Sequence, residues 1–338
     1  MKTLFVFLAL FSLNLRAQDV ENARKKLTEL GYLFEPDAFL HTIDSGDKTG
    51  FAAFMAAEID INVRASVRSL FPDCSGDGIF ETKVTPLFAA ITRGEREMVN
   101  HLLSEDADVN SKNMVCQVEG LTPLMAAIDL NDLSLAKTLI QLGAKVNRKD
   151  SKGRTALFFA LGPDASTGTA QFLIKNGADV NVGRDYNPPI IRAVLLESLP
   201  LVEFLMRNGA DINAEDIFGN SPLSLSLLGV NKELISFLLT KKASLEQKDL
   251  ITNAVMRDGD DELLLKTLLS LGADINAINS KGITPLARMA EENKVGKIKL
   301  LLKYGASLDA KSEDGSTPYQ MAVRDRNFEV AELLKVVK

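Results

Sequence analysis

Histidine and cysteine are nearly absent from this chain, which has two of each in 338 residues. His41 and His101 are far apart in the sequence, and no zinc-binding spacing of cysteine and histidine surrounds either of them. The chain also lacks a glycine-rich phosphate loop, a nucleophile elbow and a dinucleotide-binding fingerprint. We therefore interpret both histidines as packing residues, and we expect a non-enzymatic protein with no metal and no cofactor.

Long apolar runs and basic stripes are missing too. The longest apolar run, residues 4–13, is too short to cross a bilayer as a helix. Acidic residues outnumber basic ones to give a net charge of -6, and the two signs are interspersed along the chain. No surface for a phosphate backbone is expected from this pattern. The sequence thus predicts neither membrane insertion nor nucleic-acid binding, and a cationic or mixed-charge protein partner fits better.

The first 17 residues have the pattern of a secretory signal peptide. Met1-Lys2 precedes the apolar run, and Leu15-Arg16-Ala17 offers a small residue for cleavage after position 17. No cysteine follows the expected cleavage site, so we expect no lipid anchor. This pattern predicts a periplasmic protein, with secretion as the second choice. The alternative is a cytosolic protein with an apolar N-terminal helix.

One short phrase returns along most of the chain. It reads Thr85-Pro86-Leu87, Thr122-Pro123-Leu124, Thr155-Ala156-Leu157, Ser221-Pro222-Leu223, Thr284-Pro285-Leu286 and Thr317-Pro318-Tyr319. An alanine follows four of these openings at a distance of 22 residues, as Ala107, Ala144, Ala243 and Ala306. The same offset finds weaker openings near positions 37, 188 and 251. A period near 33 residues predicts a helical repeat array of nine units over residues 37–338.

Each phrase has a physical role in such a unit. Thr122 can cap a first helix that begins at Pro123, because the proline lacks only an N–H that would have no partner there. A second helix, about 133–142, has an apolar stripe and ends at Gly143. One unit cannot bury its own apolar face, so the units must stack. Within residues 18–36, the amphipathic stretch before Gly31 predicts an N-terminal capping helix.

These phrases resemble the ankyrin repeat, here in an exported bacterial form, although no unit has histidine after Thr-Pro-Leu. The resemblance covers residues 37–338 and implies an all-α solenoid of stacked helix-turn-helix units that binds another protein. In that family the first helices form a palm and the loop tips form fingers. Palm positions lie seven and eight residues after each opening, and finger tips lie three and four residues before it.

The palm and finger tips of the central units are unusually apolar. The candidate partner-binding residues are Tyr186, Leu195, Leu196, Ile217, Phe218 and Leu228. Apolar side chains on a face that should contact water are typical of an interface, and aromatic anchors often dominate its affinity. The alternative is that the irregular Pro188-Pro189 opening shifts the register, so that these leucines belong to the core.

Cys74 and Cys116 lie in the two enlarged loops, before the openings at 85 and 122. Loops of neighbouring units can approach to disulfide distance, and export places them in an oxidising compartment. The sequence therefore predicts a Cys74–Cys116 disulfide, with two unpaired thiols as the alternative. The fragment 73–78 resembles the start of a calcium loop, but Val84 stands where a carboxylate is needed. We interpret it as a polar loop.

Together these features predict a protein-interaction module that is a monomer when free. A rigid array presents a preorganised surface, so in the periplasm it could bind a folded enzyme and block its active-site cleft. We expect an inhibitor or self-protection (immunity) protein for a folded cell-wall enzyme such as a peptidoglycan peptidase. The alternatives are a periplasmic scaffold or maintenance factor, and an effector secreted to a host.

Overall fold

The computed structural model describes residues 17–66, 82–162, 167–182, 188–229, 231–245, 249–256 and 262–336. Residues 1–16, the fragment 73–78 and the candidate residues Cys74 and Tyr186 lie outside this part of the chain. The chain divides into two compact units, residues 1–178 and 179–338, and each is described by itself.

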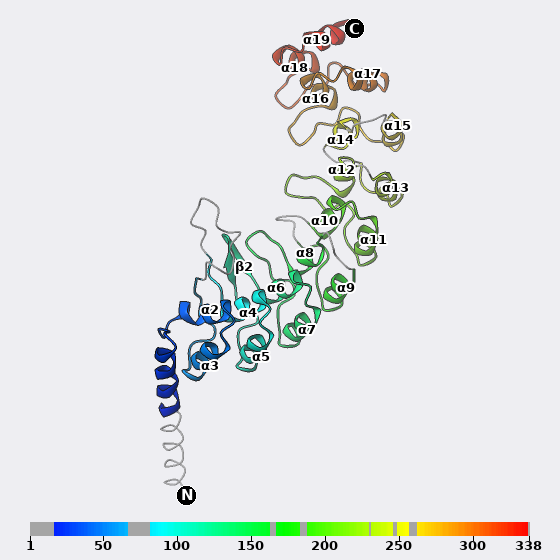
Figure 1. Cartoon of the computed structure of the whole chain (residues 1–338). Helices are drawn as coiled ribbons and strands as arrows, with labels where there is room; N and C mark the ends of the chain where they lie inside the picture. The colour runs from blue at the N-terminus through cyan, green and yellow to red at the C-terminus, as the bar shows by residue number, and fades with distance from the viewer. Residues whose placement is uncertain are drawn as a thin grey trace, which may run out of the picture. The chain divides into compact units, whose positions relative to one another are not determined.

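The first unit begins with a helix over residues 17–29 and continues as pairs of short helices (Figure 1). The pairs are α2 (Pro36–Asp44) with α3 (Lys48–Ala56), α4 (Pro86–Arg93) with α5 (Arg96–Ser104), α6 (Pro123–Asp129) with α7 (Leu133–Gln141), and α8 (Ala156–Ala160) with α9 (Thr167–Lys175). The first helices contact one another in order, α2 with α4, α4 with α6, and α6 with α8.

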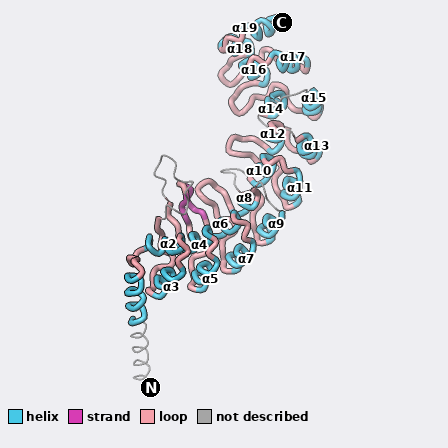
Figure 2. Tube along the Cα trace, viewed as in Figure 1, coloured by secondary structure: helices cyan, strands magenta, loops and turns pink. Residues whose placement is uncertain are grey.

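The second unit repeats the same pattern. Its pairs are α10 (Pro189–Leu195) with α11 (Leu199–Arg207), α12 (Pro222–Ser226) with α13 (Lys232–Thr240), α14 (Leu250–Met256) with α15 (Glu262–Ser270), α16 (Pro285–Glu291) with α17 (Val295–Lys303), and α18 (Pro318–Arg324) with α19 (Phe328–Val336). Figure 2 shows its loops projecting from the row of first helices, on the side away from the second helices. The predicted all-α repeat array is thus confirmed.

The opening phrases start the first helices as expected. The Thr122 hydroxyl accepts the Met125 N–H at 3.2 Å, and the Ser221 hydroxyl accepts the Ser224 N–H at 3.2 Å. A proline follows each of them at the first helical position. Gly143, at φ 89°, takes the left-handed conformation just after the second helix α7. The starts of α6 and α12 and the end of α7 are therefore satisfied within their own repeats, whereas Thr155 makes no side-chain cap hydrogen bond to α8.

Burial differs between the two helices of a pair. In α6 every residue from Pro123 to Ile128 is buried, because neighbouring first helices pack on both sides of it. In α7 only Ala136 and Leu139 are buried. Each buried leucine contributes roughly 2 kcal/mol of transfer free energy. The core is therefore a line of side chains between the two rows of helices.

Asparagines of the repeated Ala-x-x-Asn phrase join several repeats to the next. Asn181 donates from Nδ2 to the Gly209 carbonyl at 3.0 Å, and its Oδ1 accepts the Asp211 N–H at 2.8 Å. Asn110 makes the same pair of bonds in the first unit, to Gly143 and Lys145. The phrase thus carries a structural link between neighbouring loops.

Helices α14 and α2 begin two residues earlier than predicted from the constant spacing of 22 residues between an opening and the later phrase. The first backbone hydrogen bond of α14 is accepted by the Asp249 carbonyl, so Asp249 caps this helix two residues before Ile251. In the same way, Glu35 precedes α2 two residues before Asp37. Neither opening contains the Thr-Pro signal, so only its spacing to the later phrase was available in the sequence.

A β-hairpin was not predicted. Strands β1 (Asn113–Val115) and β2 (Val118–Leu121) pair antiparallel and lie in the loop with four extra residues. Buried Asn113 holds the hairpin to the start of α4, since its Oδ1 accepts the N–H of the capping residue Thr85 at 2.8 Å. The hairpin adds two short strands to an otherwise helical unit.

The N-terminal capping segment packs on the array through few side chains. Ala23 and Leu27 are the buried residues of the helix 17–29, and Gly31, at φ 82°, follows its end. The Tyr32 hydroxyl donates to Asp47 at 2.9 Å, which ties this segment to the start of α3. None of the helices in the described ranges has the length and apolarity needed to cross a membrane.

Candidate protein-binding surface

Three finger-tip turns are built in the same way. They begin at Asp150, Asp216 and Asn279, and the Oδ1 of each accepts the N–H groups two and four residues later at 2.8–2.9 Å. A glycine with positive φ stands fourth in each turn, as Gly219 does at φ 80°. Residues one and four therefore fix the turn. The side chains at its second and third places have no part in these hydrogen bonds.

The tips of these turns differ in polarity. Ser151-Lys152 and Ser280-Lys281 are polar, whereas Ile217-Phe218 is apolar. Ile217 is 56% exposed and Phe218 is 70% exposed. Since the turn forms with polar tips elsewhere, folding does not explain an isoleucine and a phenylalanine in water here. This is the local feature that most favours a contact surface.

The palm of the second unit continues the apolar surface. Its first helices are preceded by Pro188, Ser221, Asp249, Thr284 and Thr317, and the seventh residues after these are Leu195, Leu228, Met256, Glu291 and Arg324. The first three of these are apolar and are 56%, 59% and 40% exposed. We call Leu195, Leu196, Ile217, Phe218, Leu228 and Met256 the apolar surface.

These exposures decide between the two interpretations of the central leucines. Leu195 and Leu228 are exposed and Leu196 is half-buried, so the alternative that Pro188-Pro189 moves all of them into the core is wrong. Met256 was missed because its opening was placed at Ile251. Partner binding by these residues stays a prediction, and Tyr186 lies outside the described residues.

Charged groups take the place of the apolar residues in the last two repeats. The Arg288 guanidinium pairs with Glu291 at 2.7 Å and also with Glu292. Arg324 lies 3.9 Å from Glu291 and 3.6 Å from Asp314. The backbone N–H of Ser316 lowers the pKa of Asp314, and Arg324 adds to this effect. The Asp314 carboxylate is thus anionic at neutral pH.

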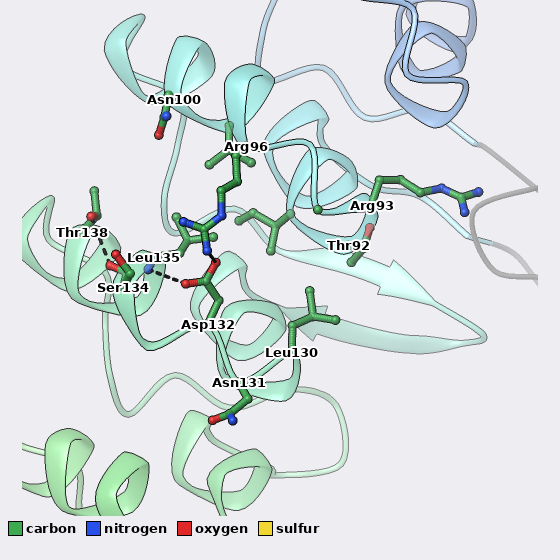
Figure 3. A pocket seen from close by; sticks show the side chains of 13 residues that line it. Thr92, Arg93, Arg96, Asn100, Leu130, Asn131, Asp132, Ser134, Leu135 and Thr138 are labelled. Carbon is green, nitrogen blue, oxygen red and sulfur yellow. Dashed lines mark hydrogen bonds and ion pairs between the residues drawn. The ribbon is translucent and has the colours of Figure 1, made fainter.

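A pocket of about 520 Å³ lies in the first unit, between the end of α4, α5, the residues that follow α6, and α7 (Figure 3). Arg96 and Asp132 point toward one another across it, with 2.8 Å between Nη2 and Oδ2. Asp132 also accepts the Leu135 N–H at 3.0 Å and so caps α7. The ionisable pair of this pocket is therefore part of the helix packing.

Histidine and cysteine can be placed only in part. The rings of His101 and Phe51 meet edge to face with 5.8 Å between their centroids, but His101 and His41 are both exposed, so neither is a core residue. Over the described ranges, no three His, Cys, Asp or Glu side chains gather as metal ligands. Cys116 lies at the tip of the β1–β2 hairpin with φ 49°. Because Cys74 lies outside the described residues, the disulfide stays a prediction.

Comparisons with known proteins agree with this architecture. A family model described as ankyrin repeats in three copies matches residues 112–184 and 251–336, and a single ankyrin-repeat model matches residues 83–114. This chain belongs to the ankyrin-repeat family. Ankyrin repeats are protein–protein interaction modules, and proteins built from them are generally non-enzymatic. The array is therefore a protein-binding architecture.

Similar curated proteins come from several sources. An ankyrin-repeat protein of Fowlpox virus (strain NVSL) is 28% identical over 53% of this chain and 54% of its own length. Human ankyrin repeat and SOCS box protein 6 is 33% identical over 29% of this chain and 24% of its own. An ankyrin-repeat protein of Rickettsia bellii (strain RML369-C) is 32% identical over 34% of this chain and 65% of its own length. The chain spans less than two thirds of each of these relatives, and the exported bacterial form stays a prediction.

Proposed function

We propose that the second unit of this ankyrin-repeat protein binds a folded protein partner through the apolar surface. The carrying observation is the Ile217-Phe218 tip, which replaces a polar pair in a turn whose hydrogen bonds are otherwise unchanged. Phe218 is 70% exposed, so about 140 Å² of a side chain of about 200 Å² can be buried on binding, which contributes roughly 3 kcal/mol at about 25 cal/mol per Å². That is enough to make it a central anchor.

The compartment and the partner form the finer part of the proposal. The signal-peptide pattern of residues 1–17 supports export to a periplasm. A stacked array needs little ordering on binding, so it is suited to tight capture of a folded enzyme. The proposed role is an inhibitor or self-protection protein that covers a cell-wall enzyme such as a peptidoglycan peptidase. A Cys74–Cys116 disulfide is part of this proposal, because the compartment would be oxidising.

The test exchanges the apolar tip for a tip that the chain already contains. The full chain with a C-terminal affinity tag is expressed in its source cell, and proteins captured from the periplasmic fraction are quantified by mass spectrometry. The variant Ile217→Ser/Phe218→Lys copies the tip Ser280-Lys281. The control Leu263→Ser removes an apolar side chain that is 76% exposed on the second helix α15.

We expect one hydrolase to be captured in stoichiometric amount by the wild type and by the control, and at least tenfold less by the tip exchange, since tenfold corresponds to about 1.4 kcal/mol. The captured hydrolase should be slower in the presence of the array. Equal capture by all three proteins would exclude the apolar surface. Capture of several envelope proteins without inhibition would favour a scaffold. Absence of the chain from the periplasmic fraction would contradict the proposed export.

A further inference from the structure

The palm of the second unit changes character along its length. Its apolar part ends at Met256, and the next two repeats present Glu291-Glu292 and Arg324-Asp325 at the equivalent positions. Because equivalent residues of stacked repeats are in one row, a partner that covers Leu228 and Met256 is directed towards these charges. The chemistry of the charged end therefore bears on the kind of partner that fits.

The charged end has a net negative charge. The palm and finger-tip positions of these last two repeats contain five carboxylates, at Glu291, Glu292, Glu313, Asp314 and Asp325, and two cations, at Lys281 and Arg324, and the nearby Arg288 brings the cations to three. Glu291 is shared by both arginines, and Arg324 also lies 3.5 Å from Asp325. The two arginines are thus engaged by carboxylates of the protein, which leaves an excess of negative charge for a partner.

We propose that the partner presents a protein segment with apolar side chains for the apolar surface and lysine or arginine side chains for the charged end. This inference rests on the proposed function, since it specifies the partner of the same surface. Helices that pack together are about 10 Å apart, so Leu195, Leu228 and Met256 cover roughly 20 Å along the row. The cationic side chains would then follow about 10–20 Å beyond the last apolar contact.

Charge complementarity of this kind has a measurable signature. Exposed ion pairs contribute about 0.2–1 kcal/mol each and are screened by salt. They also raise the association rate more than they slow dissociation. Binding through the apolar surface alone would instead depend little on salt. The salt dependence of the affinity therefore separates the two parts of the palm.

The probe is a phage-displayed library of random peptides, selected at low salt on the immobilised full chain. The affinities of the enriched peptides are then measured for wild type, for Glu291→Gln/Glu292→Gln and for the tip exchange Ile217→Ser/Phe218→Lys. The matched control is Glu203→Gln/Glu332→Gln, which removes two carboxylates that pair with cations of their own second helices.

We expect enriched peptides to combine aliphatic or aromatic residues with lysine or arginine towards one end. Their affinity should fall with added salt and about three- to tenfold in Glu291→Gln/Glu292→Gln, with no change in the control. If circular dichroism shows that this variant is unfolded, the salt dependence of peptide binding by the wild type tests the inference instead. Peptides without basic residues, affinities independent of salt, or no enrichment at all would overturn the inference.

The experiment distinguishes failure of the cationic requirement from failure of the apolar surface as the binding site. Peptides that lack basic residues but lose binding in the tip exchange would leave the apolar surface in place and remove only the cationic requirement. Peptides that bind the tip exchange as tightly as the wild type would instead locate binding elsewhere and overturn both.

Discussion

Replacing Asp150 by asparagine tests how a finger-tip turn is held together. The Asp150 side chain is fully buried, and its Oδ1 accepts the Lys152 and Arg154 N–H groups at 2.9 Å. Its Oδ2 accepts the Arg154 Nε–H at 2.7 Å. Asn279 fills the same position in another repeat and keeps the two backbone bonds. The substitution therefore removes the ion pair and leaves the turn.

The cost follows from what replaces the lost oxygen. An asparagine that keeps Oδ1 on the backbone turns its amide nitrogen towards the Arg154 Nε–H, so two donors face each other in a buried site. A hydrogen bond to a charged group contributes about 1.5–3 kcal/mol, and we expect a loss of about 2–3 kcal/mol in the free energy of unfolding. Asp150→Ala also removes both backbone bonds and should cost about 3–5 kcal/mol.

Asp216→Asn is the matched control. The Oδ2 of Asp216 accepts from the Asn220 amide at 3.0 Å, and that amide can turn over to present its own oxygen instead. We expect a loss of only about 0.5–1 kcal/mol, because a neutral hydrogen bond replaces one to a charged carboxylate. Urea unfolding followed by far-ultraviolet circular dichroism measures the difference, since the chain has no tryptophan. Equal losses for the two asparagine variants would refute a contribution from the Arg154 ion pair.

Three further predictions follow from single sites. Gly120→Ala should lower the free energy of unfolding by about 1–3 kcal/mol in urea, because φ is 84° and a Cβ would lie 3.1 Å from the Asp150 Cα; an unchanged midpoint would contradict this. Backbone N–H groups at the start of α3 lower the pKa of Asp47, so its stabilisation is present above the unfolded pKa of about 4 and lost as pH falls through the folded pKa. Acid unfolding of Asp47→Asn should therefore depend less on pH in that range, and curves parallel to the wild type would argue otherwise. Thiol titration of the denatured, unreduced protein should find no free thiol from Cys74 and Cys116, whereas two free thiols would exclude the disulfide.

The sequence was sufficient for the repeat architecture because the same physical signals recur in it. A hydroxyl cap followed by proline marks the helix starts at Thr122 and Ser221, and the structure confirms both. The signal is weakest where the phrase is degenerate, so Asp249 was not recognised as a cap and Met256 was missed. Their places depend on loop lengths, which a constant period cannot supply.

The β1–β2 hairpin shows a second limit of sequence reasoning. Four extra residues indicated an insertion, but the turn residues Cys116 and Gln117 take positive φ values of 49° and 67° without the Asn-Gly pair that usually marks such a hairpin. Buried Asn113 holds the hairpin through a partner 28 residues away in the sequence. A contact of that separation gives no local pattern to detect.

The construction of the finger-tip turns has a consequence for evolution and engineering. Because Asp216 and Gly219 fix the backbone of this turn, the exposed side chains of Ile217 and Phe218 between them can change with little effect on the folding free energy. Mutation can thus alter what this protein recognises at Ile217 and Phe218 while the array stays equally stable. Randomising only these two codons would give a small library in which nearly every member folds, so that differences between members report recognition alone.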